Sequence, residues 1–384
     1  MASPQIERAD ARAVAGAFFA NGALFGAWAS RIPTVMETFS LRPAVLGALL
    51  LLLAGGAILA FSAAGRAADK FGAVRTTRVV AGLYLVTFIG IGLAPTFALL
   101  ASALFLFGAT HGGMDVAMNS WGAAHERRRA RVILPIFHAV FSLGAGLGAA
   151  AGSLALRFDL SITVHFAGFA LLLVPLLFLP AAPEAPRVEA PPSRARIFAW
   201  PGPGLLVIGM VAFSMSLGEG AMADWSAVYL VEIAKTEPSQ AALGYTVFSV
   251  AMVAVRLSGG LLARWWPPDR IVAASGVAAA GGAALVALST SYGIILLGFF
   301  LMGAGYALVV PLSFSRAADH DDGKSGQSIA GVATFGYGGM LLGPPVLGVI
   351  AETTSLSVAF GVLALLALST IAGQSAYRSR PDGK

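Results

Sequence analysis

The chain has 384 residues, of which 57% are hydrophobic and 11% are charged, and it contains no cysteine. Soluble domains carry roughly 25% charged residues, so this composition excludes an ordinary soluble protein, and the lack of cysteine excludes disulfides and thiolate metal sites. The formal net charge of +6 does not indicate nucleic-acid binding, because the basic residues gather in short segments between long apolar stretches. We predict no cofactor, no metal and no nucleic-acid partner.

Twelve apolar stretches follow one another along the chain, each long enough to cross a bilayer as a helix. About 20 apolar residues span the hydrocarbon core, whereas a strand of a membrane barrel needs only ~10. We therefore predict an all-α membrane protein of twelve transmembrane helices. The predicted spans are 13–36, 44–64, 76–94, 97–121, 132–156, 162–180, 201–231, 243–263, 271–290, 292–315, 326–350 and 355–376.

The basic residues predict which side of the membrane each loop faces. With the N-terminus inside, 20 Lys and Arg residues fall on the inner side and only 4 on the outer side. Positive charge marks cytoplasmic loops, so we expect both termini in the cytoplasm of a bacterial cell and a multi-pass protein in its inner membrane.

Two halves of the chain match at an offset of 195 residues. FLFGATHG (105–112) lies over FLMGAGYA (300–307), and Gly144 and Gly148 lie over Gly339 and Gly343. This repeat predicts an N-terminal six-helix half (1–180), a Pro-rich cytoplasmic linker (181–200) and a C-terminal six-helix half (201–384). In such repeats the solute site lies near the midplane, at the interface of the halves.

In the span at 13–36, Asn21, Phe25 and Trp28 share one helical face. Such a face could line a small-ligand site. The alternative is an aromatic stripe that packs in the core or against lipid.

The segment GRAADKFGAVR (65–75) follows the second span and has the pattern G-x-x-x-D-[RK]-x-G-x-x-[RK]. It resembles the loop signature of the major facilitator superfamily, and with the repeat this resemblance covers essentially the whole chain. The resemblance implies a cytoplasmic gate motif that holds the outward-open state, formed by Gly65, Asp69, Lys70, Gly72 and Arg75. The alternative is an ordinary basic turn.

Four further stretches resemble the YbjJ/MosC-like branch of that superfamily, which implies small polar solutes as substrates. They are NGALFGAWASRIP (21–33), DVAMN (115–119), FHAVFSLGAGLGA (137–149) and EGAMADWSAVYL (219–230).

Ionisable residues inside a span cost about 2.5–3.5 kcal/mol each and so indicate function. His111, Asp115 and Asn119 follow one another every four residues, and the carboxylate could share a proton with the imidazole. The alternative is that Asp115 and Asn119 bridge neighbouring helices. His138, in the span at 132–156, is a further candidate, or simply a packed histidine.

In the span at 201–231, Glu219 is a candidate carboxylate of the transport path, and its flanking glycines could let the helix break there. Arg256, in the next span, could reach Glu219 or extend towards the headgroups. We place Asp224 and Trp225 at an outer gate or helix end. Tyr306, which the repeat aligns with His111, and Tyr337 complete the candidates.

These features predict a secondary transporter, not an enzyme. The sequence has no phosphate-binding Walker loop, no HExxH motif and no GxSxG motif. The leading hypothesis is proton-coupled symport of a small polar solute by alternating access, carried out by a monomer in the lipid bilayer. The alternative is a proton-antiport exporter of amphipathic, drug-like compounds.

Overall fold

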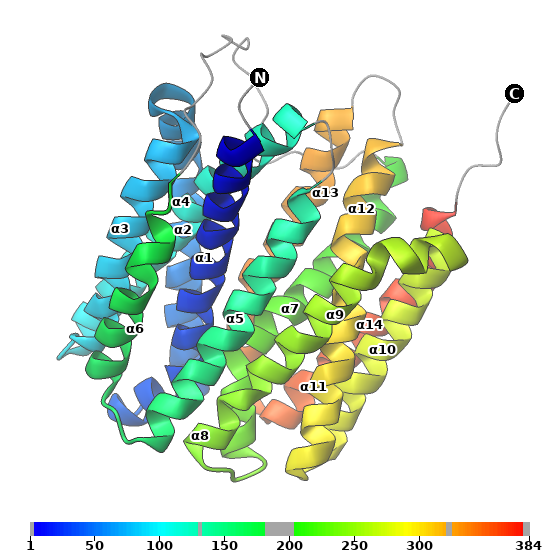
Figure 1. The fold of residues 1–384 in the computed structure, drawn as a ribbon. Coiled ribbons are helices and arrows are strands. Elements are labelled where there is room, and N and C mark those ends of the chain that lie inside the picture. The colour runs from blue at the N-terminus through cyan, green and yellow to red at the C-terminus, as the bar shows by residue number, and fades with distance from the viewer. Residues whose placement is uncertain (1–3, 130–132, 181–202, 320–324, 379–384) are drawn as a thin grey trace, which may run out of the picture. The chain divides into compact units, whose positions relative to one another are not determined.

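A computed structural model describes residues 4–129, 133–180, 203–319 and 325–378, and every regular element in these ranges is helical (Figure 1). The predicted linker at 181–200 lies outside the described residues. The helices are α1 (Pro4–Thr38), α2 (Pro43–Phe71), α3 (Ala73–Gly92), α4 (Phe97–Arg129), α5 (Leu134–Arg157), α6 (Ile162–Leu177), η1 (Pro203–Leu205), α7 (Leu206–Glu232), α8 (Pro238–Ala241), α9 (Leu243–Trp265), α10 (Pro268–Leu288), α11 (Tyr292–Tyr306), α12 (Val309–Ala318), α13 (Ser325–Thr353), α14 (Leu356–Gly373) and η2 (Gln374–Tyr377).

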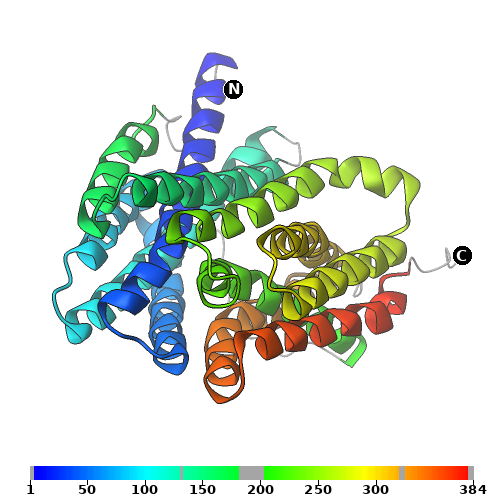
Figure 2. The ribbon, with the colours of Figure 1, turned by 90° about the horizontal axis from the view of Figure 1, so that it is seen from below.

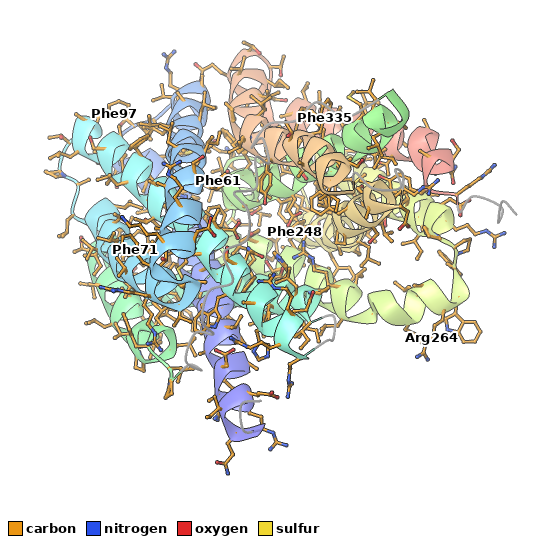
Figure 3. The ribbon with its side chains drawn as sticks, turned by 90° about the horizontal axis from the view of Figure 1, so that it is seen from above. Phe61, Phe71, Phe97, Phe248, Arg264 and Phe335 are labelled. Atoms are coloured by element: carbon orange, nitrogen blue, oxygen red, sulfur yellow. The ribbon has the colours of Figure 1, made fainter. Side chains whose placement is uncertain are left out.

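The helices confirm the all-α, multi-pass prediction. Within the described ranges, eleven helical stretches are long and apolar enough to cross a membrane, and α6 is a shorter apolar helix of 16 residues. Large apolar side chains point outward, as Phe71 and Phe97 do in Figure 3, and Leu288 is 89% exposed. Water would oppose such exposure, whereas lipid accepts it.

Four predicted spans need correction, among them the second, since α2 continues to Phe71. The helix α1 begins at Pro4 and α4 ends at Arg129, so both extend well beyond the apolar stretches that predicted them. The predicted span at 292–315 consists of two helices, α11 and α12, which Ala307 and Leu308 separate. Pro311 explains this interruption, since proline lacks the N–H that would bond to the carbonyl group four residues earlier.

The chain forms two compact units. The first unit comprises Met1–Glu189 together with Glu237–Thr246, and the second unit comprises Ala190–Thr236 together with Val247–Lys384. The first unit therefore contains α1 to α6 and the short helix α8, and the second contains most of the remaining helices.

Glycines bring α1 and α5 of the first unit into backbone contact (Figures 1 and 2). A Cβ atom at Gly22 or Gly26 would lie 2.0 or 1.9 Å from a carbonyl oxygen of α5. In return, a Cβ atom at Gly144 or Gly148 would lie 2.2 or 2.0 Å from a carbonyl oxygen of α1. Small residues allow this close approach between membrane helices, where no hydrophobic drive holds helices together.

The second unit repeats these contacts between α7 and α13. A Cβ atom at Gly339 would lie 2.2 Å from the carbonyl oxygen of Phe213, and one at Gly343 would lie 2.6 Å from that of Leu217. Gly144 and Gly148 face Phe19 and Ala23 in the same way. The glycines that the repeat aligned in the sequence therefore have the same structural role in both units.

A second pair of aligned glycines gives the same result. A Cβ atom at Gly108 would lie 1.9 Å from the carbonyl oxygen of Leu53, and one at Gly303 would lie 2.2 Å from that of Phe248. Gly303 follows Gly108 by 195 residues, and Phe248 follows Leu53 by the same number. The internal repeat is thus a repeat of helix packing as well as of sequence.

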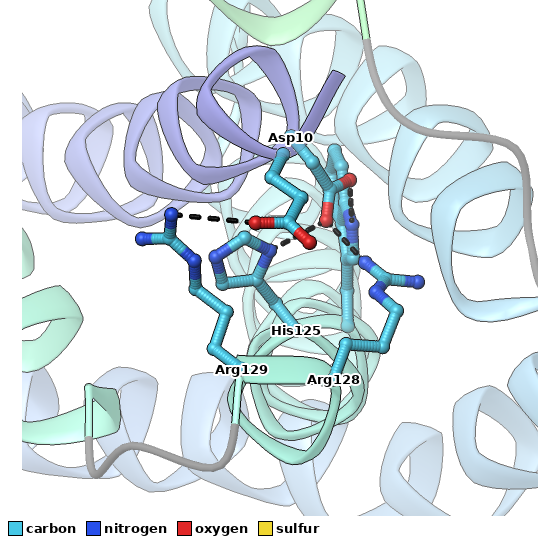
Figure 4. A network of polar contacts seen from close by, with 6 residues as sticks. Asp10, His125, Arg128 and Arg129 are labelled. Carbon is cyan, nitrogen blue, oxygen red and sulfur yellow. Dashed lines mark hydrogen bonds and ion pairs between the residues drawn. The ribbon is translucent and has the colours of Figure 1, made fainter. Parts of the chain in front are cut away.

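Asp10 fastens the start of α1 to the end of α4 (Figure 4). Its buried carboxylate accepts hydrogen bonds from Trp121 Nε1 at 3.0 Å and from His125 Nδ1 at 2.7 Å, and it pairs with Arg128. Nearby, Glu7 pairs with Arg129 at 3.4 Å. These contacts lie in the parts of α1 and α4 that extend beyond the predicted spans. They explain why both helices continue past their apolar stretches.

Candidate functional site

The first unit holds a polar cluster around His111 on α4. The imidazole Nδ1 lies 3.0 Å from the hydroxyl oxygen of Tyr84 on α3 and 2.9 Å from Asn21 Oδ1 on α1. The ring of Phe25 stacks on the imidazole, with centroids 4.8 Å apart and an angle of 21° between the planes. Three helices therefore converge on one half-buried histidine.

The partners of Nδ1 allow two tautomers of His111. If Nδ1 carries its proton, it donates to Asn21 Oδ1; if it does not, it accepts the Tyr84 hydroxyl proton. The Asn21 amide also donates to the sulfur of Met118, at 3.6 Å. The cluster of Asn21, Tyr84 and His111 is thus formed by uncharged groups that both donate and accept. We call it the histidine cluster.

Asp115 and Asn119 continue the stripe on α4, as the spacing predicted, and both are partly exposed. Asn119 Nδ2 donates to Asp115 Oδ1 at 3.2 Å and to the Asp115 carbonyl oxygen at 2.9 Å. Within the described residues no hydrogen bond joins His111 to Asp115. The predicted sharing of a proton between them is therefore wrong for this conformation, because the imidazole turns towards α1 and α3.

Two other candidates of the first unit lie in packed positions. Trp28 is fully buried, and its ring is tilted against Phe107 with centroids 6.2 Å apart. His138 contacts the ring of Phe18 edge-on at 5.3 Å. The predicted face of α1 therefore divides: Asn21 and Phe25 contact His111, whereas Trp28 belongs to the core.

The second unit holds an ion pair between Glu219 on α7 and Arg256 on α9. Arg256 Nη2 lies 3.3 Å from Glu219 Oε1, and the two side chains are only 15% and 19% exposed. This contact confirms the pairing that the sequence left open. We call it the Glu219–Arg256 pair.

The interruption between α11 and α12 supplies the pair with a further acceptor. Arg256 Nε donates to the carbonyl oxygen of Ala307 at 3.4 Å. Within a helix, this carbonyl group would bond to the N–H of residue 311, but Pro311 has none. An interrupted membrane helix that offers a backbone carbonyl to a charged group is a common feature of transporter sites.

The helix α7 does not break beside Glu219, contrary to the sequence-based suggestion. It runs from Leu206 to Glu232, and Gly218 serves a different purpose. A Cβ atom there would lie 2.2 Å from the hydroxyl oxygen of Tyr306, so the glycine makes room for this buried tyrosine.

Asp224 and Trp225 lie inside α7 and are buried, so their predicted placement at a helix end is wrong. Trp225 Nε1 donates to the carbonyl oxygen of Pro344 at 3.1 Å. Asp224 is 7% exposed, and its Oδ1 has no hydrogen-bond partner among the described residues. Tyr337, the last candidate of this unit, is 46% exposed on α13.

The predicted gate motif is mostly helical: Gly65, Asp69 and Lys70 lie in the last turns of α2, Gly72 forms the turn, and Arg75 lies in the first turn of α3. Gly72 adopts φ 97°, a value that side chains other than glycine rarely reach, which explains the glycine. Asp69, Lys70 and Arg75 are exposed, and Lys70 Nζ lies 5.1 Å from the centroid of the Phe71 ring. Gly65 faces α4, where a Cβ atom would meet Val116 at 3.9 Å.

The sequence analysis missed three groups: Tyr84 of the histidine cluster, Asp10 of the contact between α1 and α4, and the Ala307 carbonyl group that accepts from Arg256. Tyr84 lies in an apolar run with no spacing signal, and Asp10 precedes the first apolar stretch. The carbonyl group of Ala307 had a usable signal, because a proline four residues later within a predicted span leaves a carbonyl unpaired.

Comparisons with known proteins agree with this architecture. A profile of the Major Facilitator Superfamily matches residues 13–344. The chain is 44% identical over 360 residues to an uncharacterized transporter, y4wD, of Sinorhizobium fredii (strain NBRC 101917 / NGR234), covering 93% of this chain and 95% of the relative. It is 32% identical over 363 residues to the membrane protein MosC of Rhizobium meliloti, covering 94% and 87%.

Solved structures share the fold at low sequence identity. The nucleoside transporter NupG superposes with a TM-score of 0.74 at 17% identity, covering 96% of this chain and 99% of that chain. A bacterial homologue of the human lysosomal transporter Spinster superposes with a TM-score of 0.67 at 14% identity, covering 99% and 100%. With the family profile and the relatives, the helices and their repeat lead to one conclusion: this chain is a multi-pass membrane transporter of the Major Facilitator Superfamily.

Proposed function

We propose that the chain moves a small, uncharged polar solute across the bacterial inner membrane by proton-coupled symport with alternating access. The observation that carries this proposal is the histidine cluster. Its groups donate and accept hydrogen bonds without net charge, and Phe25 adds an apolar surface. This combination suits hydroxyl or amide groups on a compact solute.

The Glu219–Arg256 pair supports proton coupling. Protonation of Glu219 would remove the negative charge of the ion pair and weaken its hold on Arg256, which also donates to the Ala307 carbonyl oxygen. An acceptor atom of the solute could then replace Glu219 as a partner of Arg256. An inward proton gradient would drive uptake through this exchange of partners. Asp115 is a second candidate proton carrier, since Asn119, which donates to its carboxylate, is neutral.

The remaining parts of the proposal concern orientation and assembly. The distribution of basic residues supports cytoplasmic termini, and the exposed gate motif at the turn between α2 and α3 then lies on the cytoplasmic side. We propose that this motif acts as the cytoplasmic latch, that Asp224 and Trp225 act near the outer gate, and that a monomer suffices for transport.

The first experiment identifies the solute. Purified protein in detergent is heated with a panel of sugars, polyols, amines, carboxylates and drugs, since a ligand that binds the folded state raises its unfolding temperature. The proposal expects hits among neutral polar solutes. Hits confined to amphipathic drugs would favour an exporter instead.

The second experiment tests coupling with the hit from that panel. Proteoliposomes are given an inward proton gradient, and uptake of the labelled solute is followed with and without an uncoupler. We expect concentrative uptake that the uncoupler abolishes. Identical uptake in both conditions would contradict proton coupling, and accumulation in inside-out vesicles would indicate export.

A further inference from the structure

Arg31 is a buried cation for which no acid is found in the described residues. Arg31 lies on α1 and is only 2% exposed. Its Nη2 donates to the carbonyl oxygen of Leu160 at 2.6 Å, and its Nε donates to Nδ1 of His165 at 3.2 Å. No ion pair of Arg31 is found in the part of the chain that the structure describes. An uncompensated charge at such a position is costly.

The contact with Arg31 fixes the proton of His165. An arginine nitrogen can only donate, so Nδ1 of the imidazole must accept. The neutral ring therefore carries its proton on Nε2. That atom is buried and has no hydrogen-bond partner among the described residues, and the residue is 5% exposed. Among the described residues, a buried N–H donor without an acceptor thus lies beside a buried positive charge without an acidic partner.

The start of α6 makes the surroundings of His165 favourable for negative charge. His165 lies in the first turn of α6, which Ser161 caps by accepting from the Val164 N–H. The N-terminal end of a helix carries partial positive charge. Gly152 on α5 lets the Ser30 hydroxyl and the imidazole approach, since a Cβ atom there would lie 1.8 Å from Ser30 Oγ and 3.5 Å from His165 Cε1.

We infer that Arg31 and His165 form a binding site for a small carboxylate anion. A carboxylate is planar, accepts only, and matches a guanidinium edge next to a single N–H donor. The site is separate from the histidine cluster, because Arg31 lies about 15 Å further along α1 than Asn21.

The test compares acetate with acetamide, its neutral analogue of nearly the same shape. Purified full-length protein in a neutral detergent is titrated with each compound, and the ionic strength is held constant with a bulky morpholine sulfonate. We expect acetate to raise the unfolding temperature by about 2 °C or more, in a saturable manner, and acetamide to leave it unchanged.

Two variants and one control test whether the acetate response arises at Arg31 and His165. Arg31→Gln and His165→Phe should each abolish the acetate response. Arg157→Gln removes an exposed arginine from the last turn of α5 and should retain it. Equal responses to acetate and acetamide, or an acetate response that survives in both variants, would overturn the inference. So would stabilisation by phosphatidylglycerol without any stabilisation by acetate.

A second measurement detects acetate binding in the protein with Arg31 intact, so it does not depend on whether an Arg31 variant folds. The chain has five histidines, so selective ¹⁵N-histidine labelling gives few imidazole signals, and His165→Phe assigns one of them. Acetate should shift the His165 Nε2 signal, with half-saturation at the same concentration as the thermal titration. No shift at an acetate concentration that saturates the thermal response would also overturn the inference.

Discussion

The two units of the molecule share a repeated scaffold and differ in the chemistry of their polar groups. In the first unit, the histidine cluster joins three helices through neutral hydrogen bonds. In the second unit, the Glu219–Arg256 pair joins two helices through opposite charges, and a helix interruption supplies a third partner. The scaffold is nevertheless repeated, since Gly108 and Gly303 make the same backbone contact 195 residues apart.

One aligned position shows how this difference arises. The repeat places Tyr306 where the first unit has His111. His111 is half-buried and shares its Nδ1 between two helices, whereas Tyr306 is fully buried with its hydroxyl group against Gly218. The duplicated backbone therefore fixes where side chains can meet, and the side chains decide the chemistry. We expect the first unit to recognise the solute and the second to respond to the proton.

The largest effect should come from the shared scaffold. In Gly148→Ala the new Cβ would lie 2.0 Å from the Ala23 carbonyl oxygen, so α1 and α5 must separate. We expect a loss of most monodisperse protein in detergent gel filtration. Gly343→Ala, with 2.6 Å available in the second unit, should lose less. Gly168→Ala, which meets nothing within 4 Å, is the control; equal yields for Gly148→Ala and Gly168→Ala would break the comparison.

The next effect concerns the charged unit. Arg256→Gln leaves Glu219 without its cation, and we expect proton-driven uptake in proteoliposomes to fall at least about tenfold, with a lower unfolding temperature. Because Glu219→Gln/Arg256→Gln removes both charges, this double variant should recover the unfolding temperature and still lack proton-driven uptake. If the double variant takes up solute as the wild type does, the pair has no part in coupling.

His111→Phe tests the neutral unit. The variant keeps a ring to stack on Phe25 and removes the hydrogen bond of Nδ1, which joins it to Asn21 or to Tyr84 according to the tautomer. Each neutral hydrogen bond contributes roughly 0.5–1.5 kcal/mol, so the dissociation constant of the solute should rise about tenfold. The coupling ratio of protons to solute should not change. A changed ratio with unchanged affinity would reverse the roles that we assign to the two units.

The smallest effect should follow the removal of one hydroxyl group. Tyr84→Phe removes one of the two partners of Nδ1, and we expect the solute affinity to fall about fivefold, corresponding to roughly 1 kcal/mol. Tyr306→Phe removes the hydroxyl group at the position aligned with His111 and should leave the affinity unchanged. Isothermal titration of the solute into each variant measures both affinities. Equal affinities for the two variants would contradict the prediction.

The fold was largely predictable because membrane helices and their close contacts depend on local sequence. Apolar length gives the spans, and the glycines at 144, 148, 339 and 343, which the repeat aligns, make matching close contacts. The ends of α1 and α4 were not predictable in this way. Asp10 and His125 extend these helices by a contact between residues 115 positions apart, which no local pattern contains.

The site was predictable only in part, for a related reason. Spacing along one helix correctly grouped Asn21 with Phe25, and it placed His111, Asp115 and Asn119 on one stripe. It could not say that the imidazole turns towards Tyr84 instead of Asp115, because that choice depends on how α3 and α4 rotate against each other. The pairing of Glu219 with Arg256 was accessible, since few charges lie within the spans.

The carboxylate of Asp10 has a consequence for handling the protein. It is the acceptor for Trp121 and His125, both buried near the end of α4. Trimming the first ten residues would leave these donors without a partner, at a cost of about 1–3 kcal/mol for each buried group. N-terminal deletions should therefore end before Glu7, so that both Glu7 and Asp10 are kept.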